Sequence, residues 1–150
     1  MIQRIQTLFL LGVTITSVLL LFFPFVEYTS VEHGKFSINL MPGNNAKVNS
    51  MFFLPVVLNF LNLVFSIFVI LQYKKRVVQI KLASLLMAFN SILLGTMLLF
   101  DFISTGEGKT YTKIYLLGSY LPIISILFSF MAIRYIKKDE ELVRSAERLR

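Results

Sequence analysis

Four long apolar stretches constrain the fold of this 150-residue chain more than any other feature. They cover approximately residues 5–25, 51–73, 82–103 and 114–136. Each has the length, about 20 residues, that a helix needs to cross a hydrocarbon layer about 30 Å thick. Lipid offers no partner for a backbone amide, and tilted barrel strands are shorter than these stretches, so helices are expected. The sequence therefore predicts an all-α membrane protein, a four-transmembrane-helix bundle that forms one polytopic domain.

The composition agrees with a membrane location. Hydrophobic residues make up 56% of the chain and charged residues only 15%, whereas soluble domains are about 25% charged. No Asp, Glu, Lys, Arg or His lies within residues 5–26, 51–73 or 82–100. The first stretch is longer than the apolar part of an export signal and lacks a small-x-small cleavage site. It is therefore expected to remain as an uncleaved first span.

The charges at the ends of the spans predict the orientation. With the N-terminus in the cytoplasm, eleven of the fifteen basic residues lie on the inner side, namely Arg4, Lys74, Lys75, Arg76, Lys81, Arg134, Lys137, Lys138, Arg144, Arg148 and Arg150. Acidic residues divide evenly between the sides, so the outer side is neutral and the inner side carries the whole net charge of +7. Topology and attraction to anionic lipid headgroups explain this charge without sequence-specific nucleic acid binding. We expect both termini to be cytoplasmic.

The connections between the spans differ in content. In the outer loop, residues 26–50, strand-favouring residues precede His33 and Gly34, and apolar and polar residues alternate from 36 to 40. This pattern predicts a small outer β-hairpin with a two-residue turn at His33-Gly34. The hairpin either caps the outer end of the bundle or offers a strand edge to a partner strand. Residues 74–81 are predicted to form the inner loop, and residues 104–113 a short flexible outer loop.

The sequence argues against catalysis and against a metal or cofactor site. It contains no cysteine and a single histidine, His33, so thiolate and histidine metal clusters are not expected. It also lacks a glycine-rich phosphate-binding motif. Asp101 and Glu107 form the one conceivable acid pair, but both are expected in the water of the outer headgroup region. We therefore expect no enzyme, no cofactor and no metal.

Neutral polar residues inside the spans are informative because lipid penalises them unless they find partners. Asn59, Asn62 and Ser66 are spaced to share one helical face with Pro55. The candidate intramembrane polar cluster comprises Asn59, Asn62, Ser66, Asn90, Ser91 and Ser125. Asn62 and Asn90 lie near the centres of neighbouring antiparallel spans and are expected to be able to meet there. The cluster either joins helices by hydrogen bonds or lines a polar pocket for a lipid headgroup or small amphiphile.

Small residues form two further stripes. Ser84, Ala88, Ser91 and Gly95 repeat along the third span, and Gly118, Pro122, Ser125, Ser129 and Ala132 repeat along the fourth. Such spacing predicts close approach of helix backbones. Pro122 is expected to kink the fourth helix and free a carbonyl near Gly118, which favours a cavity.

The cytoplasmic tail, residues 137–150, contains neither Gly nor Pro and places Leu142, Ala146 and Leu149 on one face. It predicts a C-terminal cytoplasmic helix of about 20 Å, which either continues the fourth span or bends to lie on the membrane surface. The candidate residues for docking a partner or anionic lipid are Lys74, Lys75, Arg76, Lys81, Lys137, Lys138, Arg144, Arg148 and Arg150.

The two ends of the chain carry a resemblance to a known family. The opening MIQRIQT and the closing DEELVRSAERLR resemble the domain-of-unknown-function 4293 family, short four-span inner-membrane proteins of Bacteroidota-type bacteria. The resemblance implies a multi-pass protein of the bacterial cytoplasmic (inner) membrane. It implies no activity and supplies no catalytic residues.

Two functions follow as expectations. The first is a non-enzymatic accessory subunit or scaffold of a membrane complex, with a membrane-protein or cytoplasmic partner docked on the basic inner loop and C-terminal helix. The alternative is a small carrier or channel, or a protein that binds lipid or an amphiphile, with an interior lined by Asn and Ser.

Overall fold

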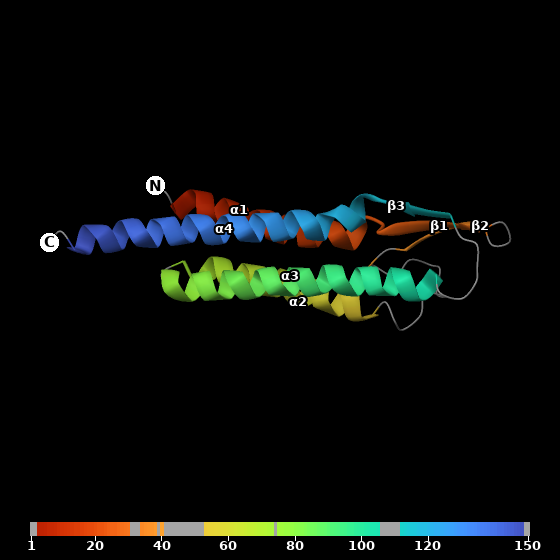
Figure 1. Ribbon diagram of the computed structural model, residues 1–150, viewed down its shortest axis with the longest axis horizontal. Helices are drawn as coiled ribbons and strands as arrows, with labels where there is room; N and C mark the ends of the chain where they lie inside the picture. Colours follow the sequence, from red (N-terminus) through yellow and green to blue (C-terminus); the bar gives the residue numbers. More distant parts are fainter. Residues whose placement is uncertain are drawn as a thin grey trace.

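Four long helices form an elongated antiparallel bundle in the computed structural model (Figure 1). The structure describes residues 3–30, 34–38, 40, 53–73, 75–105 and 112–148. The helices are α1 (Gln3–Phe22), α2 (Phe53–Leu71), α3 (Arg76–Thr105) and α4 (Leu117–Arg148). Each helix packs against the next along the chain, and α1 packs against α4, so the four close into a ring. The predicted four-helix bundle is confirmed.

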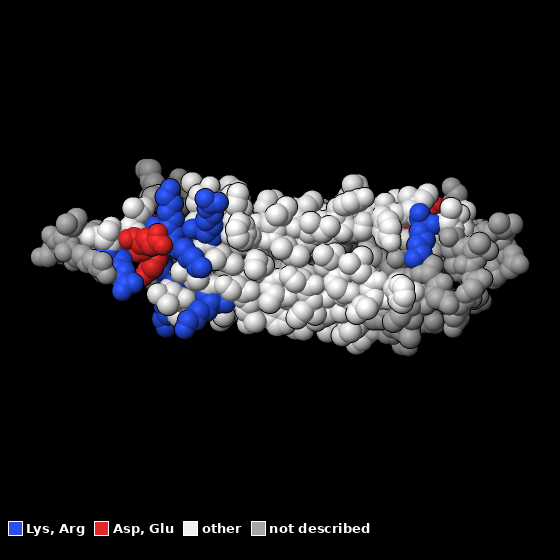
Figure 2. Space-filling view, viewed as in Figure 1, with Lys and Arg blue, Asp and Glu red and all other residues white. Residues whose placement is uncertain are grey.

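The bundle exposes many large apolar side chains and buries several polar ones beside its apolar core. On α2 the buried residues are Pro55, Asn59, Asn62, Ser66 and Val69, while the exposed ones include Phe53, Phe60 and Leu71. All four helices are long and apolar enough to cross a membrane. Figure 2 shows described charged side chains gathered at the two ends of the molecule, with the surface between them free of charge on this face. This distribution suits a multi-pass membrane protein, whose surface meets lipid.

The core is divided along the bundle axis. One apolar cluster, which includes Leu10, Val69, Leu86 and Ile136, occupies the half that contains the start of α1. A second, which includes Leu20, Phe25, Val26, Leu93 and Met97, occupies the half next to the strands. Along each helix, buried polar residues separate the two clusters.

A small antiparallel sheet lies at the end of the bundle opposite the end of α4 (Figure 1). It has three strands in the order β2-β1-β3, namely β1 (Val26–Ser30), β2 (Gly34–Ile38) and β3 (Thr112–Tyr115). The predicted hairpin is confirmed, but its predicted turn is wrong at Gly34, which lies in β2 paired with Ser30. His33 lies outside the described residues.

The third strand was not predicted. Residues 112 and 113 were assigned to a flexible loop, and Ile114 to the start of the fourth span, yet all three lie in β3. The strand pairs with β1 from Thr29↔Thr112 to Val26↔Tyr115. Because β1 has a neighbour on both sides, it cannot offer a free edge to a partner strand.

Helix ends also differ from the predicted spans. Helix α1 ends at Phe22, just before Pro24, since proline disfavours a helical conformation in the residue that precedes it. Helix α2 ends at Leu71 and α3 begins at Arg76, so Lys81 lies on a helix rather than in the predicted loop. Helix α4 continues unbroken to Arg148, which selects the continuing helix over a bend onto the membrane surface.

The start of α4 is joined to the end of α1 by backbone contacts. The Gly118 amide donates to the Pro24 carbonyl and the Leu116 amide to the Phe25 carbonyl, both over 3.1 Å. A Cβ atom at Gly118 would lie 2.5 Å from the Pro24 oxygen. Glycine is therefore required for this approach, which fixes the sheet to the bundle.

Candidate functional site

A layer of buried polar side chains crosses the middle of the bundle, with a contribution from every helix. Thr16 and Ser17 come from α1, Asn59 and Asn62 from α2, Asn90 from α3 and Ser125 from α4. Lipid surrounds this depth in a membrane, so each polar group needs a partner inside the protein.

Direct hydrogen bonds in this layer join the helices in two pairs. The Ser125 hydroxyl donates to Asn90 Oδ1 over 2.8 Å, which joins α4 to α3. Asn59 Nδ2 donates to the Ser17 carbonyl over 3.0 Å, which joins α2 to α1. Asn90 Nδ2 donates to the Leu86 carbonyl of its own helix over 2.9 Å, so both ends of the Asn90 amide are bonded.

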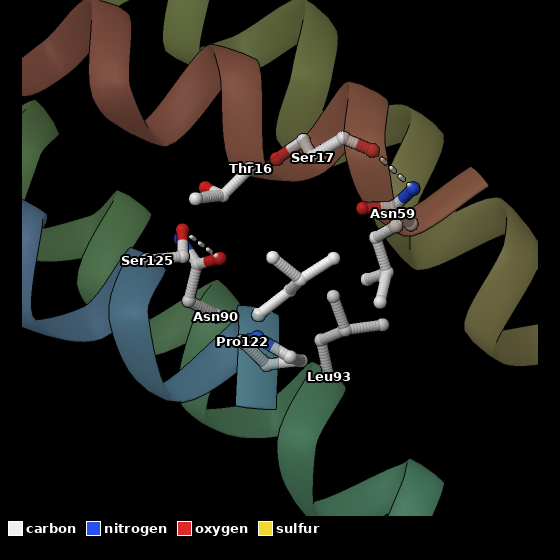
Figure 3. A pocket seen from close by; sticks show the side chains of 9 residues that line it. Thr16, Ser17, Asn59, Asn90, Leu93, Pro122 and Ser125 are labelled. Atoms are coloured by element: carbon white, nitrogen blue, oxygen red, sulfur yellow. Dashed lines mark hydrogen bonds between the residues drawn. The ribbon is translucent and has the colours of Figure 1, made fainter. Parts of the chain in front are cut away.

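A narrow cavity lies between these two pairs (Figure 3). Its lining residues are Thr16, Ser17, Leu20, Asn59, Asn90, Leu93, Leu121, Pro122 and Ser125. The volume open to the centre of a water molecule is about 0 Å³, since leucine side chains fill the space between the polar walls. A lipid headgroup or amphiphile would need the bundle to open.

Most of the predicted polar cluster is brought together. Asn59, Asn62, Asn90 and Ser125 lie in the layer, and Ser66 is buried beside it, with its hydroxyl 3.1 Å from that of Thr14. The expected meeting of Asn62 with Asn90 is not observed, because Asn90 bonds to Ser125 instead.

Ser91 does not belong to the cluster. Its side chain is exposed and its hydroxyl donates to the Met87 carbonyl of the same helix. The buried face of α3 carries Leu86, Asn90 and Leu93, and a residue adjacent to Asn90 is rotated by about 100° from that face. The predicted cluster includes both Asn90 and Ser91, but of the two only Asn90 is buried.

The two small-residue stripes have opposite outcomes. On α4, Gly118, Pro122, Ser125, Ser129 and Ala132 are all buried, as predicted. On α3, Ser84, Ala88 and Ser91 are exposed, and a Cβ at Gly95 would meet nothing within 4 Å. The prediction that the α3 stripe brings backbones together inside the bundle is wrong.

The end of the bundle where α3 begins carries the predicted basic residues (Figure 2). Lys75, Lys81, Lys137, Lys138 and Arg144 are exposed. Arg76 is half-buried instead. Lys74 and Arg150 lie outside the described residues, and the side chain of Arg148 is not described.

Arg76 forms an ion pair that the sequence analysis missed. Its Nε lies 3.3 Å from Asp139 Oδ2, and the two side chains are 24% and 10% exposed. The contact is an ion pair without hydrogen-bond geometry, since Asp139 Oδ2 has no hydrogen-bond partner among the described residues. Arg76 is the first residue of α3, so the carboxylate also lies near the positive end of that helix dipole. The pair links α4 to the first residue of α3.

Buried glutamines add two further links at the same end. Gln6 Nε2 donates to the Tyr135 carbonyl over 3.3 Å, and Gln79 Nε2 donates to the Val69 carbonyl over 3.2 Å. Among the described residues, no group of three or more His, Cys, Asp or Glu could hold a metal ion. Among the buried polar residues that the structure describes, Asp139 is the one with a charge.

A comparison with protein-family models finds a match over nearly the whole chain. The model of a family described as a domain of unknown function, DUF4293, matches residues 2–149. The chain belongs to the DUF4293 family. The match covers nearly the whole chain and confirms the family resemblance of the two ends. No curated protein and no solved structure matches the chain.

Proposed function

We propose that this DUF4293 protein is a non-enzymatic accessory subunit of a bacterial inner-membrane complex, which holds a protein partner on the cytoplasmic end of α4. The observation that carries the proposal is that α4 continues as one helix past the Arg76–Asp139 pair to Arg148. Figure 1 shows this end of α4 projecting beyond the other helices.

The projecting part of α4 has the surface of a docking helix. Leu142 is 49% exposed and Val143 37% exposed. Figure 1 shows the last turns of α4 extending beyond the ends of the other helices. The segment is held in helical form by its continuation from the membrane-spanning part of α4, so its exposed side chains are presented in a fixed helical arrangement. An exposed apolar face on such a segment is what a groove or a second helix binds.

The charges favour a protein over the lipid surface as the occupant. Glu140 and Glu141 stand between the basic residues Lys138 and Arg144, and acids are repelled by anionic lipid. The helix also runs straight on from its membrane-spanning part, so its axis leads away from the bilayer. A partner with its own mixed charges fits this surface better than a headgroup layer does.

Crosslinking at the projecting face tests the proposal. A photo-reactive residue at position 142 is expected to give a discrete crosslinked protein adduct in the native membrane, because Leu142 would lie in the contact. Position 127 is the matched control, since Leu127 is 58% exposed and would face lipid. Replacing Lys137 and Lys138 by glutamine should leave the adduct intact. Loss of the adduct in that variant would point to anionic lipid, and either that loss or the absence of any protein adduct from position 142 would contradict the proposal.

The proposed orientation places both termini in the cytoplasm and the sheet outside. Support comes from the basic residues predicted on the inner side, six of which are exposed among the described residues, namely Lys75, Lys81, Arg134, Lys137, Lys138 and Arg144. Because the chain has no cysteine, single-cysteine variants report topology without further changes. Thr112→Cys, on the exposed strand β3, should react with an impermeant maleimide in intact cells whose outer membrane is permeabilised. Lys138→Cys should react only after the inner membrane is opened, and the reverse pattern would invert the assignment.

A small carrier or channel remains the second candidate. The observation that favours it is the polar layer, to which all four helices contribute. The cavity between the two bonded pairs leaves about 0 Å³ for the centre of a water molecule, so transport would require the pairs to separate.

A further inference from the structure

Three polar atoms of α2 lack a hydrogen-bond partner among the described residues. They are Asn59 Oδ1, Asn62 Oδ1 and Asn62 Nδ2. Asn59 is 0% exposed and Asn62 is 1% exposed, so bulk water cannot reach them. Buried polar groups without a partner are rare in proteins, and their cost rises where the surroundings are apolar on every side. The atoms therefore call for a ligand inside the bundle.

The position of the atoms limits the size of that ligand. Asn59 and Asn62 are three residues apart on one helical face, which brings their side chains within about 5–6 Å of each other. Figure 3 shows the Asn59 amide nitrogen directed at the Ser17 backbone, with the Asn90–Ser125 pair on the opposite wall of the cavity. Because the cavity that Asn59 lines leaves about 0 Å³ for the centre of a water molecule, a ligand that touches both asparagines is very small.

The chemistry of the atoms limits its nature. Two of them are acceptors and one is a donor. A cation would satisfy the two oxygens and leave Asn62 Nδ2 unpaired, and an anion would leave both oxygens unpaired. Water donates two hydrogen bonds and also accepts, and a buried water makes about three hydrogen bonds on average.

We propose that Asn59 and Asn62 bind internal water at the middle of the membrane-spanning bundle. A water molecule accepts from Asn62 Nδ2 and donates to Asn59 Oδ1, and its second hydrogen, or a second water, serves Asn62 Oδ1. Of the two asparagines only Asn59 lines the cavity, and Asn62 follows it by three residues on the buried face of α2. Admitting the water would require a shift of the cavity's leucine side chains, such as Leu20 and Leu93. The proposal is independent of the partner proposed for α4.

Internal water also has a structural consequence. The described hydrogen bonds of this layer join α1 with α2 and α3 with α4, and none of them crosses between the two pairs. Water bound by Asn62 occupies the layer in which the two halves of the bundle meet. It supplies polar contact there without a direct bond between side chains.

The first experiment measures magnetisation transfer from water to side-chain amides by solid-state NMR. The full-length protein in lipid bilayers carries nitrogen-labelled asparagine. The Asn59 and Asn62 amides are expected to receive water magnetisation several times faster than Asn90. Asn90 is the internal control, because it lies in the same layer with both amide atoms bonded to protein. Transfer to Asn62 as slow as transfer to Asn90 would overturn the proposal.

The second experiment removes half of the site. Asn62→Leu replaces the donor and one acceptor at similar volume, so water transfer to Asn59 is expected to fall to the Asn90 rate. Ser91→Leu is the matched control, since Ser91 is an exposed polar residue of α3 outside the cavity, and it should leave transfer to Asn59 and Asn62 unchanged. Unchanged transfer to Asn59 in Asn62→Leu would refute a shared water. Asparagine signals that shift with sodium chloride but not with choline chloride would instead assign a cation and overturn the proposal.

Discussion

Gly118→Ala is expected to destabilise the bundle by about 3 kcal/mol, the upper end of the usual cost of inserting a methyl group into a packed site. The added Cβ would stand 2.5 Å from the Pro24 carbonyl oxygen and 2.8 Å from that of Phe23. Both neighbours are backbone atoms, so no side chain can move aside. Removing the steric clash of the added Cβ requires the two backbones to separate, which breaks the 3.1 Å hydrogen bond from the Gly118 amide to the Pro24 carbonyl. Thermal unfolding in mild detergent, followed by size-exclusion chromatography, measures the loss.

Two other glycines provide a graded control. A Cβ at Gly95 meets nothing within 4 Å, so Gly95→Ala should be neutral or stabilise α3 by up to about 1 kcal/mol through helix propensity. At Gly12 the nearest atom belongs to the Phe128 ring, at 2.8 Å, and a side chain can shift. The expected order of destabilisation is therefore Gly118, then Gly12, then Gly95. Equal stability of the Gly118 and Gly95 variants would show that the backbones do not approach closely at Gly118.

The same glycine illustrates what a spacing pattern can predict. Gly118 was expected to belong to a small-residue stripe that brings helices together, and it is buried as expected. Its close neighbours, however, are the Phe23 and Pro24 carbonyls at the corner between α1 and β1. The spacing identifies a need for small side chains but not the segment that approaches them.

The helices and the hairpin were predictable because local signals specify them. The length of an apolar stretch predicts a membrane-spanning helix, and the alternation of apolar and polar residues from 36 to 40 predicts a half-buried strand. Strand β3 has only four residues, and it pairs with Val26–Thr29, which lie more than eighty residues earlier in the sequence. No local pattern in so short a segment separates a strand from the start of an apolar span.

The error on α3 has a different cause. In a soluble helix the apolar face marks the inside, but in a membrane helix apolar residues cover both faces. Ser84, Ala88 and Ser91 were assigned to the interior from spacing alone, whereas the interior face is the one with Asn90. The polar face of α2 was predicted correctly because asparagine is excluded from lipid more strongly than serine or alanine is. Asparagine was therefore the more reliable guide to the interior.

The Arg76–Asp139 pair was beyond sequence analysis because the two residues come from different predicted segments. Both were expected among solvated charges, Arg76 in a loop and Asp139 in the tail. Only the position of α4 against the first residue of α3 brings them to 3.3 Å. Asp139 is 7% exposed, and Arg76 is the cation beside it among the described residues.

Arg76→Leu is therefore expected to destabilise the protein by about 3 kcal/mol, the lower end of the range for breaking a buried pair, since Arg76 keeps some exposure. The loss arises because Asp139 is left as an uncompensated buried charge. Removing both charges, in Arg76→Leu with Asp139→Leu, should restore most of the stability, because the pair's own attraction is largely offset by the cost of desolvating it. Unfolding of the two single variants and the double variant gives the coupling energy. Lys75→Leu is the matched control, an exposed neighbouring cation whose loss should change stability by less than about 0.5 kcal/mol. If Arg76→Leu costs no more than Lys75→Leu, the pair does not hold α4 against the first residue of α3, and the base of the proposed docking helix must be fixed in another way.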